Sequence, residues 1–250
     1  MIKLKFKRII KNGLRFIIEK KAIKVIYDIL LVVLIPGITI VYNYLSHEIT
    51  IINNMNSITI GSSVEYMDNA LGIPIFKCIH DDFEERVYNN TYGVVRAFYE
   101  DGRLIGYCVT AKKVNSKLEL PRRYKQFSEG KNLGKFTFSE IKGTPGNVDS
   151  YITNGSGDLA YCEEYYFGSS GDYNIFEFIY IDYGFEKLSF TTRDEYVKDE
   201  KIEKAVIPEY EGGYVWIDRK ESYPNSYAIM TEDVKEYILS YIDFQFGNLQ

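Results

Sequence analysis

The feature that most constrains this chain is a run of 18 residues, Ile29 to Ser46, that contains no charged side chain. A helix needs about 20 apolar residues to cross a bilayer, so the run lies at the lower end of that length. We therefore predict a single transmembrane signal anchor at residues 23–47. The residues that mark this membrane segment are Ile29, Leu34, Pro36, Gly37, Tyr42 and Tyr44.

Four of these residues have defined roles in such a helix. Tyr42 and Tyr44 are typical of the membrane–water interface, where an aromatic ring with a polar tip is favourable. Pro36 and Gly37 predict a kink, which membrane helices tolerate better than soluble ones. A buried core helix would rarely follow so many basic residues. A cleaved signal peptide needs small residues at its cleavage site, and residues 42–46 are too bulky.

Charge is distributed unevenly along the chain. Residues 1–28 contain nine Lys or Arg and two Asp or Glu, a balance of +7, so the rest must carry −12 to give the total of −5. Because basic flanks stay in the cytoplasm, we expect an inner-membrane protein with a cytoplasmic N-terminus and a C-terminal domain in the periplasm or outside the cell. So acidic a domain disfavours a nucleic-acid partner, since phosphate binding needs basic surface.

Residues 1–22 predict a basic amphipathic helix. Apolar side chains recur at helical spacing on one face, and basic side chains occupy the other positions; the apolar set is Ile2, Phe6, Ile9, Ile10, Leu14, Ile17 and Ile18. Such a helix lies on the surface of an anionic leaflet, so anionic lipid is an expected partner. A solvated basic tail is the alternative.

A first module is expected at residues 57–112, after a short polar connection at 48–57. Ser62 and Glu65 have capping-box spacing and predict a helix that begins after Ser62. Three strand-like runs follow, at 85–88, 92–99 and 103–110, and Asp101-Gly102 between the last two predicts a hairpin. The unit is a helix packed on an antiparallel meander, so the fold class is α+β.

This module resembles the small domain of the BamE/SmpA envelope lipoproteins and of the tandem β-lactamase-inhibitor proteins. The shared pattern is an apolar residue with Gly, a capped helix and Leu-Gly-x-Pro, matched by Ile60-Gly61 and by Leu71 to Pro74. The chain departs from that family in lacking a lipobox cysteine. The resemblance implies a binding or scaffolding module and not an enzyme.

A second, β-rich module with a C-terminal helix is expected at residues 133–250. Its predicted strands lie at 136–141, 159–167 and 173–181, and residues 148–152 are either a single helical turn or the edge of a loop. Residues 219–229 are rich in turn formers. A helix should follow with Thr231 as its cap, and its docking face repeats at helical spacing through Val234, Tyr237, Ile238, Tyr241 and Ile242.

Three features together resemble a family of bacterial membrane-anchored proteins that is named after a locus tag of enterotoxigenic (ETEC) strains. They are the N-terminal anchor, the run from Tyr161 to Tyr173, and Pro224-Asn225-Ser226-Tyr227. The family has no established activity. The resemblance therefore implies a topology and an organisation, and it assigns no catalytic residue.

No catalytic, cofactor or metal signature is found in the sequence. His80 with the neighbouring acidic residues 81–85 has no metal-site spacing and is best interpreted as a solvated acidic turn. Of the three cysteines, Cys162 fits a strand core, and a bridge between Cys78 and Cys108 is left open. We therefore predict no enzymatic activity and no cofactor.

Tyrosine is unusually frequent, with 23 residues. Tyrosine gives a large, stiff contact area, so the candidate binding surface is Tyr161, Tyr165, Tyr166 and Tyr173. Strand propensity explains the same frequency equally well. The predicted function is a bitopic protein whose extracytoplasmic domain binds a protein or envelope component, with a homo-oligomer compatible with this topology. The alternative is a membrane-acting effector of a phage-defence (abortive infection) system.

Reporter fusions test the predicted topology directly. A periplasm-dependent reporter should be inactive when fused after residue 20 and active when fused after residue 250, because the basic head stays in the cytoplasm. A cytoplasm-dependent reporter at the same two sites should give the opposite pattern. Cytoplasmic activity at residue 250 would overturn the assignment.

Overall fold

The computed structural model describes residues 2–113, 115–152, 159–166, 174–181, 191–193, 201–202, 216–235 and 237. The chain divides into two compact units, Met1–Thr50 and Ile51–Gln250. Each unit is described by itself.

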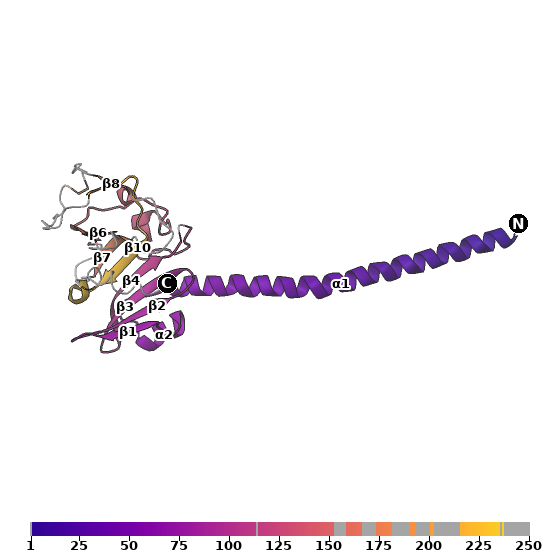
Figure 1. The fold of residues 1–250 in the computed structure, drawn as a ribbon, viewed down its shortest axis with the longest axis horizontal. Coiled ribbons are helices and arrows are strands. Elements are labelled where there is room, and N and C mark those ends of the chain that lie inside the picture. The colour runs from indigo at the N-terminus through magenta and orange to yellow at the C-terminus, as the bar shows by residue number, and fades with distance from the viewer. Residues whose placement is uncertain are drawn as a thin grey trace. The chain divides into compact units, whose positions relative to one another are not determined.

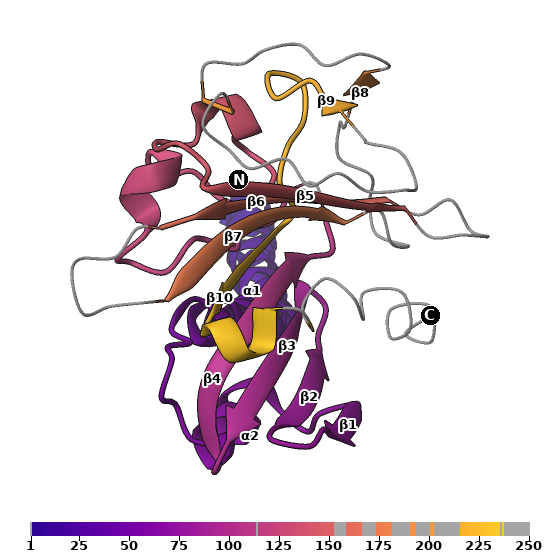
Figure 2. The same ribbon diagram turned by 90° about the vertical axis from the view of Figure 1, so that its left-hand side faces the viewer.

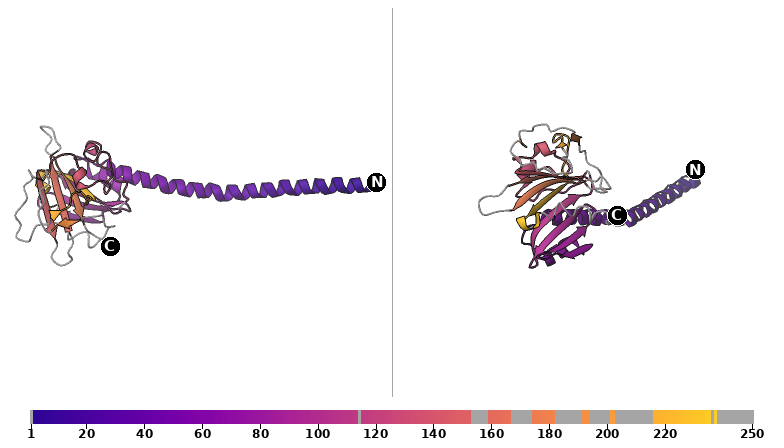
Figure 3. Two further views of the ribbon diagram at one scale, coloured as in Figure 1. Left: turned by 90° about the horizontal axis from the view of Figure 1, so that it is seen from above. Right: turned by 60° about the vertical axis from the view of Figure 1, so that its left-hand side comes forward.

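The first unit belongs to a single helix, α1, which spans Ile2–Asn56 and continues through Pro36 (Figures 1 and 3). The predicted surface arm and the predicted anchor are thus parts of one helix, with no break between residues 22 and 23. The expected polar connection at 48–57 is wrong, because α1 continues to Asn56. Its last residues belong to the second unit, where Ile52 and Met55 are buried.

The second unit contains an eight-stranded antiparallel sheet of strand order β1-β2-β3-β4-β10-β7-β6-β5 (Figure 2). Together with α1 and a second helix, α2 (Val64–Leu71), this sheet confirms the α+β class. The strands are β1 Phe76–Ile79, β2 Glu84–Asn89, β3 Gly93–Glu100, β4 Arg103–Ala111, β5 Asn147–Ile152, β6 Leu159–Tyr165, β7 Ile175–Ile181 and β10 Ser226–Met230. β8 (Thr192–Arg193) and β9 (Trp216–Ile217) form a separate pair.

The first half of the sheet follows the predicted meander closely. The cap of α2 is Ser63, one residue later than expected, and its side chain accepts a hydrogen bond from the Tyr66 N–H. Asp101 and Gly102 turn the β3–β4 hairpin with positive φ angles of 47° and 73°, which explains the Asp-Gly pair at this turn. β1 was not predicted.

Three predictions for the second half are wrong. Residues 136–141 do not form a strand but contain a 3₁₀ helix, Phe138–Glu140, because Thr137 and Glu140 cap each other. Residues 148–152 belong to strand β5, and the turn-rich stretch 219–229 contains most of β10. After β10 a 3₁₀ helix, Glu232–Val234, follows Thr231, and the predicted continuation of the C-terminal helix lies outside the described residues.

β10 lies between β4 and β7 and joins the two halves into one sheet (Figure 2). Asn225 fixes its entry: its side-chain amide donates to the Ile181 carbonyl (2.7 Å) and accepts from the Ile181 N–H (2.9 Å). On the other side, the Asn225 carbonyl accepts from the Ala111 N–H and the Ser226 hydroxyl donates to Thr110. The modules expected at 57–112 and 133–250 therefore share one sheet.

Both faces of the sheet are buried, and one of them carries most of the aromatic core. Its buried aromatic side chains are Tyr88, Tyr99, Tyr107, Tyr161, Tyr165, Phe176, Phe178, Tyr180 and Tyr227. The opposite face holds a second cluster that includes Cys108 and Cys162. The tyrosine content of these strands is thus used largely for packing.

A buried ion pair lies within the aromatic face. The Glu163 carboxylate accepts from the Arg219 guanidinium at 2.6 Å and 2.9 Å, and from the hydroxyls of Tyr161 (2.8 Å) and Tyr165 (2.5 Å). Arg219 also donates to the Phe138 carbonyl (2.9 Å). The Glu163 side chain is 0% exposed and that of Arg219 is 2% exposed, so each charge depends on its partner for solvation.

Replacing Glu163 with Gln should destabilise the protein by about 3–5 kcal/mol, because the Arg219 charge stays buried without its counter-ion. The measurement is chemical denaturation of the detergent-solubilised full chain, followed by circular dichroism. Glu129→Gln is the matched control, since Glu129 pairs with Lys142 at the surface (3.3 Å) and should change stability little. Equal effects of the two substitutions would contradict this account.

Candidate functional site

A cavity of about 720 Å³ lies in the second unit, between the segment that follows α1 and one end of the sheet. It is lined by Asn56, Ser57, Ile58, Thr59, Ile60, Tyr107, Pro121, Arg122, Arg123, Tyr124, Asn174 and Ile229. These residues come from the end of α1 and the connection that follows it, from β4, from the turn at 121–124, from the position before β7 and from β10. The cavity is thus assembled from five separate parts of the chain.

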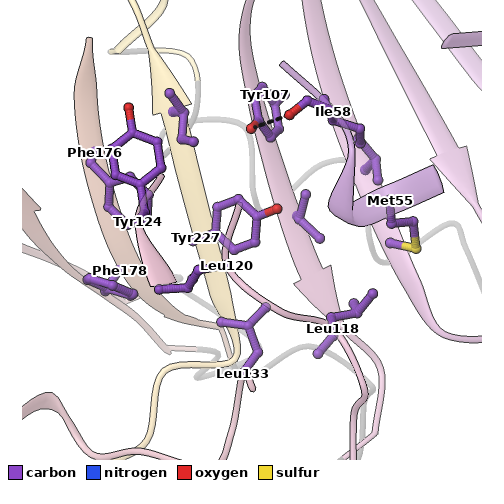
Figure 4. Close-up of a cluster of buried hydrophobic side chains, with 14 of the residues drawn as sticks. Met55, Ile58, Tyr107, Leu118, Leu120, Tyr124, Leu133, Phe176, Phe178 and Tyr227 are labelled. Carbon is purple, nitrogen blue, oxygen red and sulfur yellow. Dashed lines mark hydrogen bonds between the residues drawn. The ribbon is translucent and has the colours of Figure 1, made fainter. Parts of the chain in front are cut away.

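Three of the lining residues, Ile58, Tyr107 and Tyr124, belong to the buried hydrophobic cluster that Figure 4 draws. Tyr107 is 1% exposed, and its hydroxyl donates to the Ile58 carbonyl at 3.0 Å. Burial raises the pKa of Tyr107 well above its usual value, so the phenol stays neutral. Tyr124 packs against Phe176 with ring centroids 4.7 Å apart. These contacts hold a neutral aromatic wall in place.

Two arginines stand on the rim. The turn that carries them is closed by a hydrogen bond from the Tyr124 N–H to the Pro121 carbonyl (2.7 Å), and both Arg122 and Arg123 are exposed. The Arg123 guanidinium lies 5.8 Å from the Tyr124 ring centroid, within cation–π range. Among the residues that the structure describes, none that lines the cavity is Asp or Glu. An arginine rim over an apolar wall favours a ligand with an anionic group on an apolar body.

The chain around this turn is basic, although the body as a whole is acidic. Residues 112–142 contain nine Lys or Arg and three Glu. Each of the three carboxylates pairs with a lysine of the same segment: Glu119 with Lys125, Glu140 with Lys131, and Glu129 with Lys142. The segment keeps an excess of six positive charges, which attracts anions toward the rim.

The predicted membrane residues all lie on α1. Leu34, Tyr42 and Tyr44 are 50%, 69% and 65% exposed, and nothing lies close to Gly37. Pro36 is inside the helix, and of Ile29 only the backbone is described.

The predicted tyrosine surface needs correction. Tyr161 and Tyr165 are 2% and 0% exposed and hold Glu163 inside the core, so they cannot form a surface. Tyr166, the next residue, is 65% exposed, and Tyr173 lies outside the described residues. Tyr166 is exposed because it lies just beyond the end of β6, whose residues 160–165 are buried on both faces, and the sequence alone does not say where the strand ends.

His80 is not part of a solvated turn. Its ring nitrogen lies 3.2 Å from the Glu85 carboxylate, which also pairs with Arg96 at 2.9 Å, and Glu85 and Arg96 are both buried. Cys78 and Cys108 are free thiols. They lie on β1 and β4, three strand spacings or about 14 Å apart, which is beyond the reach of a disulfide.

Sequence reasoning did not find the cavity. Its walls come from residues far apart in the chain, such as Tyr107 and Ile229, which meet the turn of Arg122 and Arg123 only in the folded structure. The arginine pair was the available signal.

Neither a protein-family model nor a curated protein matches this chain. Two solved structures are similar at low level, each with a TM-score of 0.33. One is a cysteine-rich secretory protein from Staphylococcus aureus subsp. aureus Mu50, with 10% identity over 70% of this chain and 44% of its own. The other is an extracellular protein containing a SCP domain from Bacillus anthracis str. Ames, with 9% identity over 70% and 45%. The chain thus spans less than half of either protein, and a likeness at this level carries no argument about function.

The Tyr107→Phe substitution tests the cavity wall. It leaves the buried Ile58 carbonyl without its donor and should cost about 1–3 kcal/mol of unfolding free energy. Tyr66→Phe is the control: this exposed tyrosine shares a hydrogen bond with Ser57 at the surface, so its loss should have little effect. Denaturation of the full chain in detergent measures both. If Tyr107→Phe is as mild as Tyr66→Phe, the hydrogen bond does not hold the wall.

Proposed function

We propose that this chain is a bitopic protein of the cytoplasmic membrane whose second unit binds an anionic amphiphile outside the cytoplasm. The ligand would carry a phosphate or carboxylate group on an apolar chain, and it would enter the cavity between residues 56–60 and 121–124. The single observation that carries the membrane assignment is the exposed, charge-free stretch of α1.

Exposure along α1 supports lipid contact. Val32, Ile38 and Val41 are 72%, 65% and 57% exposed, an arrangement that is unfavourable in water and favourable in hydrocarbon. The hydroxyl of Thr39 donates to the Ile35 carbonyl (2.8 Å), and that of Ser46 to the Asn43 carbonyl (3.0 Å). Polar side chains in a bilayer need such partners within their own helix, because lipid provides none.

The length of the helix also fits. Residues Leu31–Asn56, which include an 18-residue stretch with a mean hydropathy of 1.2, are long and apolar enough to cross a membrane. The last turn packs in the second unit through Ile52 and Met55. The charge-free part, residues 29–46, rises about 27 Å, close to the roughly 30 Å hydrocarbon thickness of a typical bilayer.

Charge and fold order support an external binding domain. The basic head favours a cytoplasmic N-terminus and therefore an external body. Within residues 57–112 the order is α2 followed by the meander β1 to β4, which agrees with the order implied by the resemblance to envelope binding modules. The cavity then supplies the place where such a domain would hold its ligand.

Arg122→Ala combined with Arg123→Ala tests the ligand class. The full chain, purified in detergent with added phosphatidylglycerol, should retain this lipid in native mass spectrometry. The double variant should lose most of the bound lipid, because bidentate contacts to the anionic group disappear. Phosphatidylcholine, which has no net charge, and inorganic phosphate, which has no apolar part, should both bind more weakly than phosphatidylglycerol.

The matched control is Lys113→Ala with Lys142→Ala, which removes the same charge from the same segment but not from the cavity. Equal loss of lipid in both double variants would leave only general electrostatic attraction and contradict the cavity assignment. Depolarisation of cells on expression of the chain would instead favour the membrane-acting effector.

A further inference from the structure

β1 ends the sheet and offers an open edge. Among the strands that the structure describes, it pairs only with β2. Three isoleucines in and beside it are strongly exposed: Ile73 (89%), Ile75 (49%) and Ile79 (85%). An edge strand with exposed apolar side chains is a template for pairing with another strand.

The phase of the β1–β2 pairing shows which backbone groups point outward. The His80 N–H donates to the Phe83 carbonyl (2.8 Å), so His80 is hydrogen-bonded to the β2 side. Every second residue shares this orientation in an antiparallel pair, and Cys78, opposite Glu85, therefore also points its backbone groups to β2. The backbone N–H and C=O groups of Lys77 and Ile79 then face the open edge.

We propose that a second copy of this chain pairs its own β1 with this edge, antiparallel and with Cys78 opposite Cys78. In a continuous sheet, residues that lie opposite each other share a face. Of the registers that satisfy this condition, two pair three residues of β1 with three residues of the second copy, one centred on Lys77 opposite Lys77 and one centred on Cys78 opposite Cys78. The first places like charges in contact, which is unfavourable.

The second register avoids this direct contact. Lys77 lies opposite Ile79 of the second copy, and their outward backbone groups form hydrogen bonds in both directions. The two Lys77 side chains are then diagonal to each other, at about 7–8 Å instead of directly opposite, so the repulsion between them is weaker than in the first register. The exposed isoleucines are covered in part by the same contact. Because both copies are tethered to one membrane by α1 under the proposed function, a short pairing strand is sufficient.

The cysteines meet at a position that suits a disulfide. Cys78 forms a non-hydrogen-bonded pair with its counterpart, for which Cα atoms are about 4.5 Å apart, within the range of disulfides. Cys108 and Cys162 are buried, whereas Cys78 is only partly buried. In an oxidising compartment two Cys78 thiols would lose two protons and transfer two electrons to a disulfide oxidant, which is reduced to a dithiol while the new S–S bond forms.

Cross-linking of the full chain in isolated, permeabilised membranes tests the register. Oxidation with copper phenanthroline should give a dimer on non-reducing gels for the wild type and for Cys108→Ser, and no dimer for Cys78→Ser. In the Cys78→Ser background, chains with Lys77→Cys should cross-link to chains with Ile79→Cys. Strong cross-linking of Lys77→Cys to itself would establish the other register, and no cross-linking at any of these positions would overturn the dimer.

Two substitutions of Ile79, one acidic and one basic, give an independent test. Both remove the same apolar side chain, so they differ only in the charge that they introduce. Ile79→Glu faces Lys77 of the second copy and should cross-link through Cys78 severalfold more efficiently than Ile79→Lys, which faces the same lysine with a like charge. Equal efficiency would contradict the proposed pairing.

The outcome is separable from that of the proposed function. Spontaneous disulfide formation in intact cells reports an external β1, whereas copper-induced cross-linking depends only on the pairing. Retention of phosphatidylglycerol by Cys78→Ser reports the cavity alone, and it should equal that of the wild type.

Discussion

The sheet depends on the insertion of β10 between β4 and β7. The strand has only five residues, but each of its edges is paired along its whole length, to Gly106–Thr110 on one side and to Ile175–Ile179 on the other. Asn225 bonds the end of β7 through its side chain, while the Ser226 hydroxyl bonds Thr110 of β4. Without β10 the chain would have two separate meanders with four open edges instead of one sheet with two.

Buried charge gives each half of this sheet a fixed geometry. In one half, Glu163 is held by Arg219 and two tyrosine hydroxyls; in the other, Glu85 is held by Arg96 and His80. An ion pair of this kind adds little net stability over apolar packing, but loss of one partner is costly. Arg219 also contacts the Phe138 carbonyl, so the segment between the two meanders is fixed to β6 by the same pair.

The cavity and the open β1 edge follow from this arrangement. β10 contributes Ile229 to the cavity wall, next to Tyr107 of β4, and the basic segment closes the opposite side. β1 remains at the far edge because the chain supplies no strand to cover it among the described residues. The proposed ligand site and the proposed pairing edge thus involve different parts of one sheet and can be tested separately.

The sequence by itself determined the long N-terminal apolar helix, the α2 helix and the β2–β4 meander, because each depends on local charge, capping or turn chemistry. Asp101-Gly102 is sufficient to turn a hairpin wherever it lies. The sequence did not determine β10, β5 or the 3₁₀ helix at 138–140. Nor did it determine which tyrosines are buried, since both faces of β6 are covered and Tyr166 is exposed only because it lies beyond the end of that strand. Tertiary structure decided these points through contacts between distant residues, such as Ser226 with Thr110, 116 positions apart. Tertiary structure also decided the cavity, because its walls meet only after β10 has entered the sheet.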